Sequence, residues 1–543
     1  MIGAPGAFTP AELQEIVSYG LERFIQVVPV IQAPAHFAYV LKHPQFAHLR
    51  ADGNNYQACL CDEETYKLIF RMYDDVIQAT QGVDYFFVST DEVYYAGICA
   101  KCTQPYNPVN RSLKWAEFAK RARDHLASRG RRMLAWLEYP LLPEHLKLIP
   151  SDVIDGVIGE PEYIPIEKEK GMRQLAYVSM QGAEFLFPDH LPLERALRDP
   201  PAPGQAQDPL EFERGMSTGR LQAAFEQISF GRVWQANPIG VFGAAWDDSG
   251  LHNETFWLGW SAVAQYGWTP GTPRVEQHAA EFMNVYYGPR AAGMVEIYRS
   301  LQRQARGWQR TWDRVVSKAR GPGYGNSDGK GIGTTRYDRT LEPPPLPTLP
   351  ELKLEPRFAK KYASFLAQAE ALSLENDQLV HALPANLGRA DRNHYNLEVF
   401  LALARFIGHH WRLLVGLADA ERSLDRARAA QKPEDAVGRL VAAYRAVGRL
   451  ARDGSQTFDD LRAVFEKSRH PKGRSVGGRT FVHVLDDTKD HWADRRPDLS
   501  YMIAPEQSIG LESWQKDLLR VIRSYAEAHK VPVKGLGEAR LEE

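Results

Sequence analysis

The sequence predicts an α/β protein in which a parallel sheet is followed by a region of long helices. Over the first 320 residues, short apolar segments suited to strands alternate with segments of helical periodicity. This alternation is typical of sheets built from strand–helix–strand units. Beyond about residue 350 the apolar residues recur at helical spacing, which favours an antiparallel helical bundle.

The first expected element is a helix that begins at Pro10. Thr9 can cap this helix, Pro10 fits the first helical position, and Glu12 completes a capping box. We expect the helix to end near Phe24 and to lead into the apolar run Ile25 to Ile31, the first strand candidate.

Five more strands and three more helices complete the expected sheet region. Buried strands of parallel sheets read as short, continuous apolar runs. The later strand candidates are the run from Phe86 to Thr90, Met133–Leu137, Val153–Ile158, Leu175–Met180 and Ile239–Ala245. The helix candidates are Glu63–Gln78, Lys114–Arg129 and Leu210–Ile228. Six strands are two short of an eightfold barrel.

The composition divides the rest of the chain into a linker and a helical domain. Residues 321–350 are rich in Gly and Pro with little apolar content, so we expect a linker between a domain at 1–320 and one at 351–543. The helix candidates of the last domain are Pro356–Leu383, Asn393–Ala430, Glu434–Lys467 and Leu511–His529. The pair His409-His410 could bind metal, although paired histidines on a packed helix are more often ordinary residues.

The overall composition is that of a globular protein, with 44% apolar and 25% charged residues. A net charge of −2 and a pI near 6.8 give no footprint of nucleic acid or of an anionic membrane. No apolar run approaches the roughly 20 residues of a membrane helix, and Met1 to Phe8 shows no signal peptide. We therefore expect neither nucleic acid nor membrane as a partner, while compartment and oligomeric state stay open.

Two adjacent carboxylates, Asp91 and Glu92, follow the apolar run that begins at Phe86. The carboxyl end of such a strand is where α/β folds keep their chemistry. Two carboxylates in one cleft can hold different protonation states, one neutral and acting as an acid, one ionised. The alternative is a strand that ends in a solvated Asp-Glu pair.

Three other strand candidates carry similar side chains at or near their ends. The first runs through Pro29, Ile31 and Pro34 to His36, another continues into Trp136-Leu137-Glu138, and the last ends in Trp246-Asp247-Asp248. With Asp91-Glu92-Val93, this succession resembles the catalytic barrel of glycoside hydrolase family 20, the β-N-acetylhexosaminidases. That family shows Pro-Glu-Ile-Asp-Met-Pro-Gly-His, Gly-Gly-Asp-Glu, Gly-Trp-x-Glu and Trp-x-Glu in this order.

The resemblance covers about residues 8 to 290 and implies a TIM-barrel-like (β/α)8 domain. The first two barrel strands of the family have no counterpart before Thr9, so we expect the barrel to lack them, either because the start of the gene is missing or because other elements replace them. Gln32 stands where the family has Asp, Ala35 where it has Gly, and Phe87 where it has His.

The resemblance also implies roles for the matched residues in a substrate-assisted retaining mechanism. Glu92 would be the general acid and base, and Asp91 would hold the 2-acetamido group of a terminal N-acetylhexosamine. Substrate-binding roles would fall to His36, Trp136, Glu138, Trp246 and Asp248. His36 could equally be a loop residue, and Trp246 could be a core residue.

The four cysteines form a second group of candidate site residues. Cys59 and Cys61, and 40 residues later Cys99 and Cys102, are expected in loops that leave neighbouring strands. Two close pairs favour a structural zinc ion on four thiolates. The alternatives are two disulfides across the loops or four reduced thiols. A closed four-sulfur site has no open position, so no cofactor is expected for catalysis.

A rival interpretation comes from another functional class. The barrel could have lost its activity and serve as a carbohydrate-binding or scaffold protein, with the helical region as an interaction module. The replaced Asp at Gln32 and the unmatched front strands favour this interpretation, and the intact Asp91-Glu92 pair favours an active glycosidase.

Overall fold

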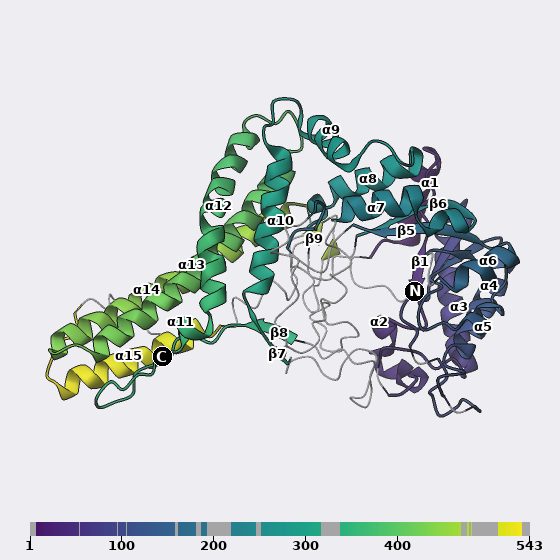
Figure 1. Ribbon diagram of the computed structural model, residues 1–543. Coiled ribbons are helices and arrows are strands. Elements are labelled where there is room, and N and C mark those ends of the chain that lie inside the picture. The colour runs from purple at the N-terminus through teal and green to yellow at the C-terminus, as the bar shows by residue number, and fades with distance from the viewer. Residues whose placement is uncertain are drawn as a thin grey trace.

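The computed structural model in Figure 1 describes most of the chain. The described residues are 7–53, 55–94, 96–104, 106–157, 161–180, 186–192, 219–245, 251–316, 337–468, 475–476, 479–480 and 509–534. A sheet domain holds the N-terminal half of the chain, and long helices extend from it as an arm (Figure 1).

Six parallel strands form the main sheet in the same order as they occur along the chain. They are β1 (Val30–Gln32), β2 (Tyr85–Ser89), β3 (Arg132–Ala135), β4 (Ile154–Asp155), β5 (Arg173–Ser179) and β6 (Pro238–Ala244). The prediction of a parallel α/β sheet is confirmed. A sequential order means that every right-handed crossover advances in the same direction, so the crossover helices cover one face.

The first strand is shorter than the apolar run that predicts it. The amide of Ile25 donates to the carbonyl of Gly20, so Ile25 belongs to the turn that ends α1 rather than to β1. Apolar composition does not distinguish a turn of this kind from a strand.

Aromatic side chains show that the sheet curls. Phe87 on β2 and Phe242 on β6 have ring centroids 5.9 Å apart, although three strands lie between them. In a flat sheet, strands four positions apart would be separated by about 19 Å. Trp136 lies between the two rings, with centroids 4.9 Å and 5.0 Å away. The inner face is therefore the concave side of a curved sheet, and aromatic rings fill it.

Helices cover the outer face of the first strands (Figure 1). The helices of the N-terminal half are α1 (Pro10–Leu21), α2 (Ala38–Leu41), α3 (Glu63–Gln78), α4 (Leu113–Ser128), α5 (Pro143–Leu146) and α6 (Tyr163–Lys170). The capping box predicted for α1 is confirmed, because the Thr9 hydroxyl accepts from the Glu12 amide and the Glu12 carboxylate accepts from the Thr9 amide.

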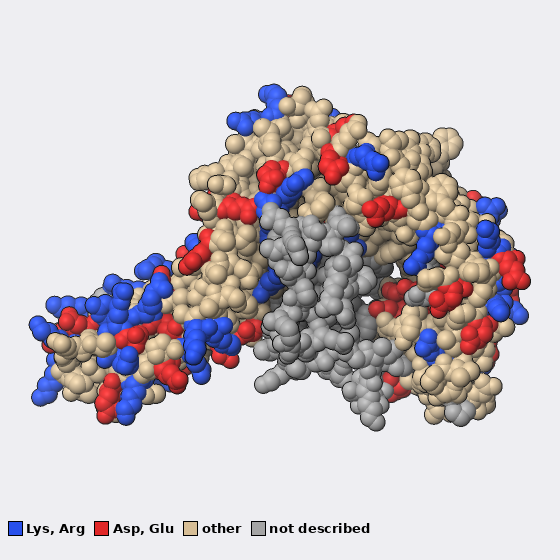
Figure 2. Space-filling model, in the orientation of Figure 1, with Lys and Arg blue, Asp and Glu red and all other residues tan. Residues whose placement is uncertain are grey.

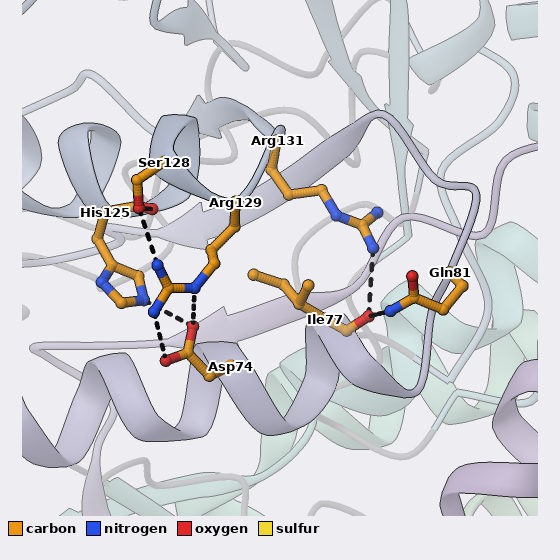
Figure 3. A network of polar contacts seen from close by, with 7 residues as sticks. All are labelled: Asp74, Ile77, Gln81, His125, Ser128, Arg129 and Arg131. Atoms are coloured by element: carbon orange, nitrogen blue, oxygen red, sulfur yellow. Dashed lines mark hydrogen bonds and ion pairs between the residues drawn. The ribbon is translucent and has the colours of Figure 1, made fainter.

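A polar network ties α3 to α4 and to the start of β3, as Figure 3 shows. The buried Arg131 guanidinium donates to the carbonyls of Ile77, Thr80 and Val83 at the end of α3. A cation at this place satisfies carbonyls that the helix itself leaves without a donor. Asp74 on α3 accepts from Arg129 at 3.0 Å and contacts His125 at 2.9 Å.

The second half of the sheet passes directly into the helical region. Here lie α7 (Arg220–Phe230), α8 (Trp257–Trp268), α9 (Val275–Tyr287) and α10 (Met294–Arg310). Residues 210–218 of the helix predicted before β6 lie outside the described residues, and the rest forms α7. One continuous apolar core runs from β5 through these helices to the end of the chain's last helix.

The helical region contains α11 (Phe358–Lys361), α12 (Ala363–Leu387), α13 (His394–Arg428), α14 (Pro433–Phe465) and α15 (Leu511–Ala528). α13 and α14 form an antiparallel hairpin, with α12 and α15 against it and α10 against α12 and α13. The structure also describes two small antiparallel pairs: β7 (Asp313–Val316) with β8 (Tyr337–Thr340), and β9 (Ser475–Val476) with β10 (Arg479–Thr480).

Two buried polar groups inside the helical region hydrogen-bond to segments far away in the sequence. The Glu421 carboxylate on α13 accepts from the amides of Arg357, Phe358 and Ala359 at 2.7–2.9 Å. His410, one of the paired histidines, contacts the Thr311 hydroxyl at 2.7 Å. Burial lowers the pKa of His410 to about 3, so this imidazole is a neutral core group.

Charged side chains of both signs crowd the far end of the helical arm (Figure 2). Several form pairs within one helix, such as Arg428 with Asp425 and Arg462 with Asp459. Such exposed pairs contribute little to stability. Among the described residues, no helix combines the length and the apolar character that crossing a membrane requires.

Candidate active site

Polar side chains follow three neighbouring strands at one edge of the sheet. His36 follows β1, Asp91 and Glu92 follow β2, and Glu138 follows β3. Because these strands are parallel and adjacent, their carboxyl ends lie side by side. The carboxyl edge of a sequentially ordered sheet is where barrel enzymes carry their catalytic groups.

His36, Asp91 and Glu92 converge at this edge. The Nε2 atom of His36 lies 3.1 Å from Glu92 Oε2 and 3.5 Å from Asp91 Oδ2. His36 has φ = 49° and Glu92 has φ = 52°. Non-glycine residues in this left-handed region are uncommon, and the strain they carry persists where the surrounding structure fixes them. Both positions therefore hold their side chains at some cost in backbone energy.

Two tyrosines that the sequence reasoning missed complete the surroundings of Glu92. The Tyr56 hydroxyl lies 3.0 Å from the Glu92 carbonyl oxygen and 3.3 Å from Glu92 Oε2, and the Tyr56 ring meets the His36 ring edge-on at 5.2 Å. Tyr94 hydrogen-bonds Glu92. Burial, and then the negative charge of Glu92, raise the pKa of Tyr94, so this phenol stays a neutral donor. Tyr94 could have been found by its place two residues after Glu92, whereas Tyr56 has no local signal.

Glu138 supplies a third carboxyl group to the cluster. Burial, followed by the charge of Asp91 and a hydrogen bond to it, raises the pKa of Glu138 well above its usual range. Like charges this close disfavour simultaneous ionisation. The raised pKa of Glu138 favours its protonated form, which can donate a hydrogen bond to Asp91.

Trp136 lies beneath the carboxyl cluster rather than beside it. Only 4% of its surface is exposed, and its ring packs against Phe87, Tyr177 and Phe242 inside the curled sheet. The Thr90 hydroxyl donates to the Trp136 carbonyl oxygen at 2.6 Å. This bond joins the ends of β2 and β3 directly under Asp91 and Glu138.

A second carboxyl pair supports the turn that carries Glu138. The Asp155 Oδ1 atom, at the end of β4, accepts from the amides of Leu137 at 3.2 Å and Val157 at 3.0 Å. Asp155 also hydrogen-bonds Glu167 on α6, and both side chains are fully buried. Burial, then the charge of Glu167, raises the pKa of Asp155, and burial raises that of Glu167 to about 7.

Trp246 and Asp248, the predicted residues after the last strand, lie outside the described residues. The structure therefore describes His36, Asp91, Glu92, Trp136 and Glu138 among the predicted substrate and catalytic residues. It brings the three carboxylates and His36 together, and it places Trp136 in the core below them.

The structure corrects the zinc prediction. The cysteines form two disulfides, Cys59–Cys99 with Cα atoms 5.8 Å apart and Cys61–Cys102 with Cα atoms 5.2 Å apart. Zinc requires ionised thiolates, and a sulfur committed to a disulfide is not one. The prediction was right that the four sulfurs meet between the loops after β1 and β2, and wrong about the chemistry that joins them.

Part of the chain matches a known protein family. Residues 3–154 match the model of the glycosyl hydrolase family 20 catalytic domain. This segment includes β1, β2 and β3 together with His36, Asp91, Glu92 and Glu138. The chain therefore carries a glycoside hydrolase family 20-like domain.

Two curated relatives are each similar to this chain over about 100 residues. Hexosaminidase D of Bos taurus is 34% identical over 99 residues, which are 18% of this chain and 28% of the relative. Hexosaminidase D of Homo sapiens is 33% identical over 103 residues, which are 18% of this chain and 20% of the relative. The matched segment thus spans about a quarter of each relative.

Solved structures show a more distant similarity. The β-N-acetylhexosaminidase of Bacteroides fragilis NCTC 9343 has 18% sequence identity and a TM-score of 0.36, covering 52% of this chain and 57% of that chain. A structure of tandem family 20 catalytic modules of the pneumococcal exo-β-D-N-acetylglucosaminidase StrH has 17% identity and a TM-score of 0.29, covering 51% and 62%.

Proposed function

From the family 20-like domain as premise, we propose that this protein removes terminal β-linked N-acetylhexosamine from glycans, with retention of configuration. The observation that carries the proposal is the convergence of Asp91, Glu92, Glu138 and His36 at one edge of the sheet, within the segment that matches the family. The family resemblance and the hexosaminidases among the relatives support the substrate class.

The first chemical step uses Glu92 as an acid. The acetamido oxygen of the substrate attacks the anomeric carbon, the glycosidic bond breaks, and Glu92 donates a proton to the departing oxygen. Asp91 holds the acetamido nitrogen and stabilises the positive charge of the resulting oxazolinium ion. His36 and Tyr56, both within 3.3 Å of Glu92 Oε2, fix the direction of that carboxyl group.

The second step uses Glu92 as a base. Glu92 accepts a proton from water and the water oxygen attacks the anomeric carbon. The bond between that carbon and the acetamido oxygen breaks, and the acetamido group returns to its neutral form. Two displacements at the same carbon retain the β configuration. The substrate provides the nucleophile, so the mechanism needs no cofactor.

Glu138 has a supporting role in this scheme. Its neutral carboxyl group donates to Asp91 and orients that carboxylate toward the acetamido group. The buried Trp136 ring packs against Phe87 and Phe242 and so anchors the turn that carries Glu138. Trp246 and Asp248 stay candidates for contacts to the ring and hydroxyl groups of the sugar.

The test uses the purified full chain with 4-nitrophenyl N-acetyl-β-glucosaminide and the corresponding galactosaminide. We expect release of nitrophenolate, loss of that release in Glu92→Gln, and a β-anomer as the first product in NMR. Hydrolysis with inversion, or activity unchanged by Glu92→Gln, would contradict the mechanism.

The second candidate function is a carbohydrate-binding protein without activity. Gln32, which ends β1 where the family has Asp, favours it. In that case the wild-type chain binds N-acetylglucosamine in calorimetry but releases no nitrophenolate from either substrate.

A further inference from the structure

Three tyrosines and an arginine form a rim beside the carboxyl cluster. This tyrosine rim consists of Tyr94, Tyr106, Tyr139 and Arg111. Tyr94 comes two residues after Glu92, and Tyr139 directly follows Glu138. Tyr106 and Arg111 come from the long loop between β2 and α4. The rim thus combines residues from two strand ends and one loop.

Specific contacts hold the rim in place. The rings of Tyr94 and Tyr139 have centroids 6.3 Å apart, and the Tyr106 hydroxyl donates to the Tyr94 carbonyl oxygen at 2.7 Å. The Arg111 guanidinium carbon lies 5.0 Å from the centre of the Tyr139 ring, and Arg111 Nε donates to the Pro140 carbonyl oxygen at 3.0 Å. Hydrogen bonds and a cation–π contact therefore hold these rings in place, although two of the rings are exposed.

Two of the rings remain accessible. Tyr139 is 46% exposed and Tyr106 is 37% exposed. Large aromatic side chains that are ordered and exposed next to a polar cluster are typical of binding surfaces. An aromatic face packs well on the C–H face of a pyranose ring, while phenol and guanidinium groups can donate to sugar hydroxyls.

We propose that the tyrosine rim is a binding subsite for the sugar on the leaving-group side of the bond that is cleaved. The inference rests on the proposed function, and it narrows the substrates to those in which the leaving group is itself a sugar. Glu92 protonates the oxygen that joins the two sugars, and Tyr94 hydrogen-bonds Glu92, so the rim begins where the leaving group departs.

The donors of the rim keep their protons. Burial raises the pKa of Tyr106, while the Arg111 charge acts in the opposite direction. Both phenols therefore stay neutral and keep their hydrogen bonds to the Tyr94 carbonyl and to Glu92. Arg111 is a permanent cation. A neutral or acidic second sugar is compatible with this set, whereas an amino sugar with a free ammonium group would face a like charge.

The experiment measures binding to full-length protein that carries Glu92→Gln, so that the ligand is not consumed. The probes are N,N′-diacetylchitobiose and methyl N-acetyl-β-glucosaminide, compared by isothermal titration calorimetry. We expect the disaccharide to bind about 10-fold more tightly, and Tyr139→Ala to weaken disaccharide binding about 3- to 10-fold without affecting the methyl glycoside. Tyr139→Phe, which keeps the ring, restores disaccharide binding.

Tyr19 provides a matched control on the same domain. It is 61% exposed and lies under the Arg23 guanidinium at 3.5 Å, on the helix that leads to the opposite end of β1. Tyr19→Ala should leave the binding of both probes unchanged.

Three outcomes would overturn the inference, and they can be told apart. Equal affinity for the two probes would show that the rim binds no second sugar, while the proposed function stands. A loss of binding for both probes in Tyr139→Ala would assign Tyr139 a structural role. If neither probe binds the Glu92→Gln protein, the proposed function fails and the subsite fails with it.

Discussion

Carboxyl groups have opposite kinds of neighbour in the two halves of this molecule. Glu421, in the helical region, accepts three backbone amides, and no other carboxyl group takes part in these bonds. Asp91, Glu92 and Glu138 meet at the sheet edge, where burial and the charges of the other two raise the pKa of Glu138. The first arrangement lowers the energy of the fold. The second opposes it, which is the usual mark of a site arranged for chemistry.

Replacing Glu92 should give the largest effect and separate activity from stability. We expect Glu92→Gln to lower kcat by about 10³-fold, because general acid–base groups contribute on this scale. The melting temperature should stay the same or rise, since one of three crowded carboxylates is removed. Both are measured on the same preparation, by nitrophenolate release and by calorimetry. A melting temperature of Glu92→Gln far below that of the wild type would show that Glu92 also stabilises the fold.

The disulfides sharpen the comparison because they stabilise the loops that hold the site. They join residues 40 and 41 positions apart and close nearly the same loop. Removing both by four Cys→Ala changes should cost about 4 kcal/mol of unfolding free energy. Removing Cys61–Cys102 alone should cost much less, because Cys59–Cys99 still closes the loop. Chemical denaturation of the three proteins tests this, and equal losses for one and two bonds would contradict it.

Glu421 should behave in the opposite way to Glu92. Glu421→Ala leaves three amides at the start of α11 without an acceptor, so we expect a loss of about 3 kcal/mol in unfolding free energy. The kcat of the folded fraction should not change, because α11 belongs to the helical region. Glu421→Gln, which keeps one acceptor oxygen, should lose less. If Glu421→Ala lowered kcat without lowering the unfolding free energy, Glu421 would act on the reaction rather than on the fold, and the contrast with Glu92 would be wrong.

The smallest expected effect is a pH dependence that comes from Glu167. Burial raises its pKa from 4.5 to about 7, so the native chain keeps a proton that the unfolded chain releases. The native state is therefore favoured most at low pH, and this part of the stability is lost as the pH rises from about 4.5 through 7. In Glu167→Gln the decline should be smaller by about 2 kcal/mol. Denaturant titrations at pH 5 and pH 8 test this, and parallel declines would contradict it.

Local patterns predicted much of the fold, because buried strands and amphipathic helices have characteristic spacings of apolar residues. The strands from Phe86, Met133 and Leu175 lie within a few residues of β2, β3 and β5. The gathering of His36, Asp91 and Glu92 was also predictable, since the ends of adjacent parallel strands share an edge. That these residues act on a glycan stays a prediction.

Contacts between distant segments were not predictable from the sequence. Tyr56 reaches Glu92 from a loop 36 residues earlier, and Glu167 meets Asp155 from the outer helix α6. Neither residue stands in a motif. The paired spacing of the cysteines favours zinc but also fits disulfides, and only the positions of the sulfurs distinguish the two. Trp136 lies inside the continuous apolar run Met133–Leu137, and a run without alternation does not show to which face a side chain points.

The paired disulfides also determine what a protease can release from this domain. Any single cut between residues 62 and 98 falls inside the covalent loop closed by Cys59–Cys99 and Cys61–Cys102. The two pieces, one with His36 and the other with Glu138, would stay joined. On a non-reducing gel the nicked chain would migrate near its full mass, and only a reductant would separate it into fragments. A band that looks intact is therefore no proof of an uncut chain.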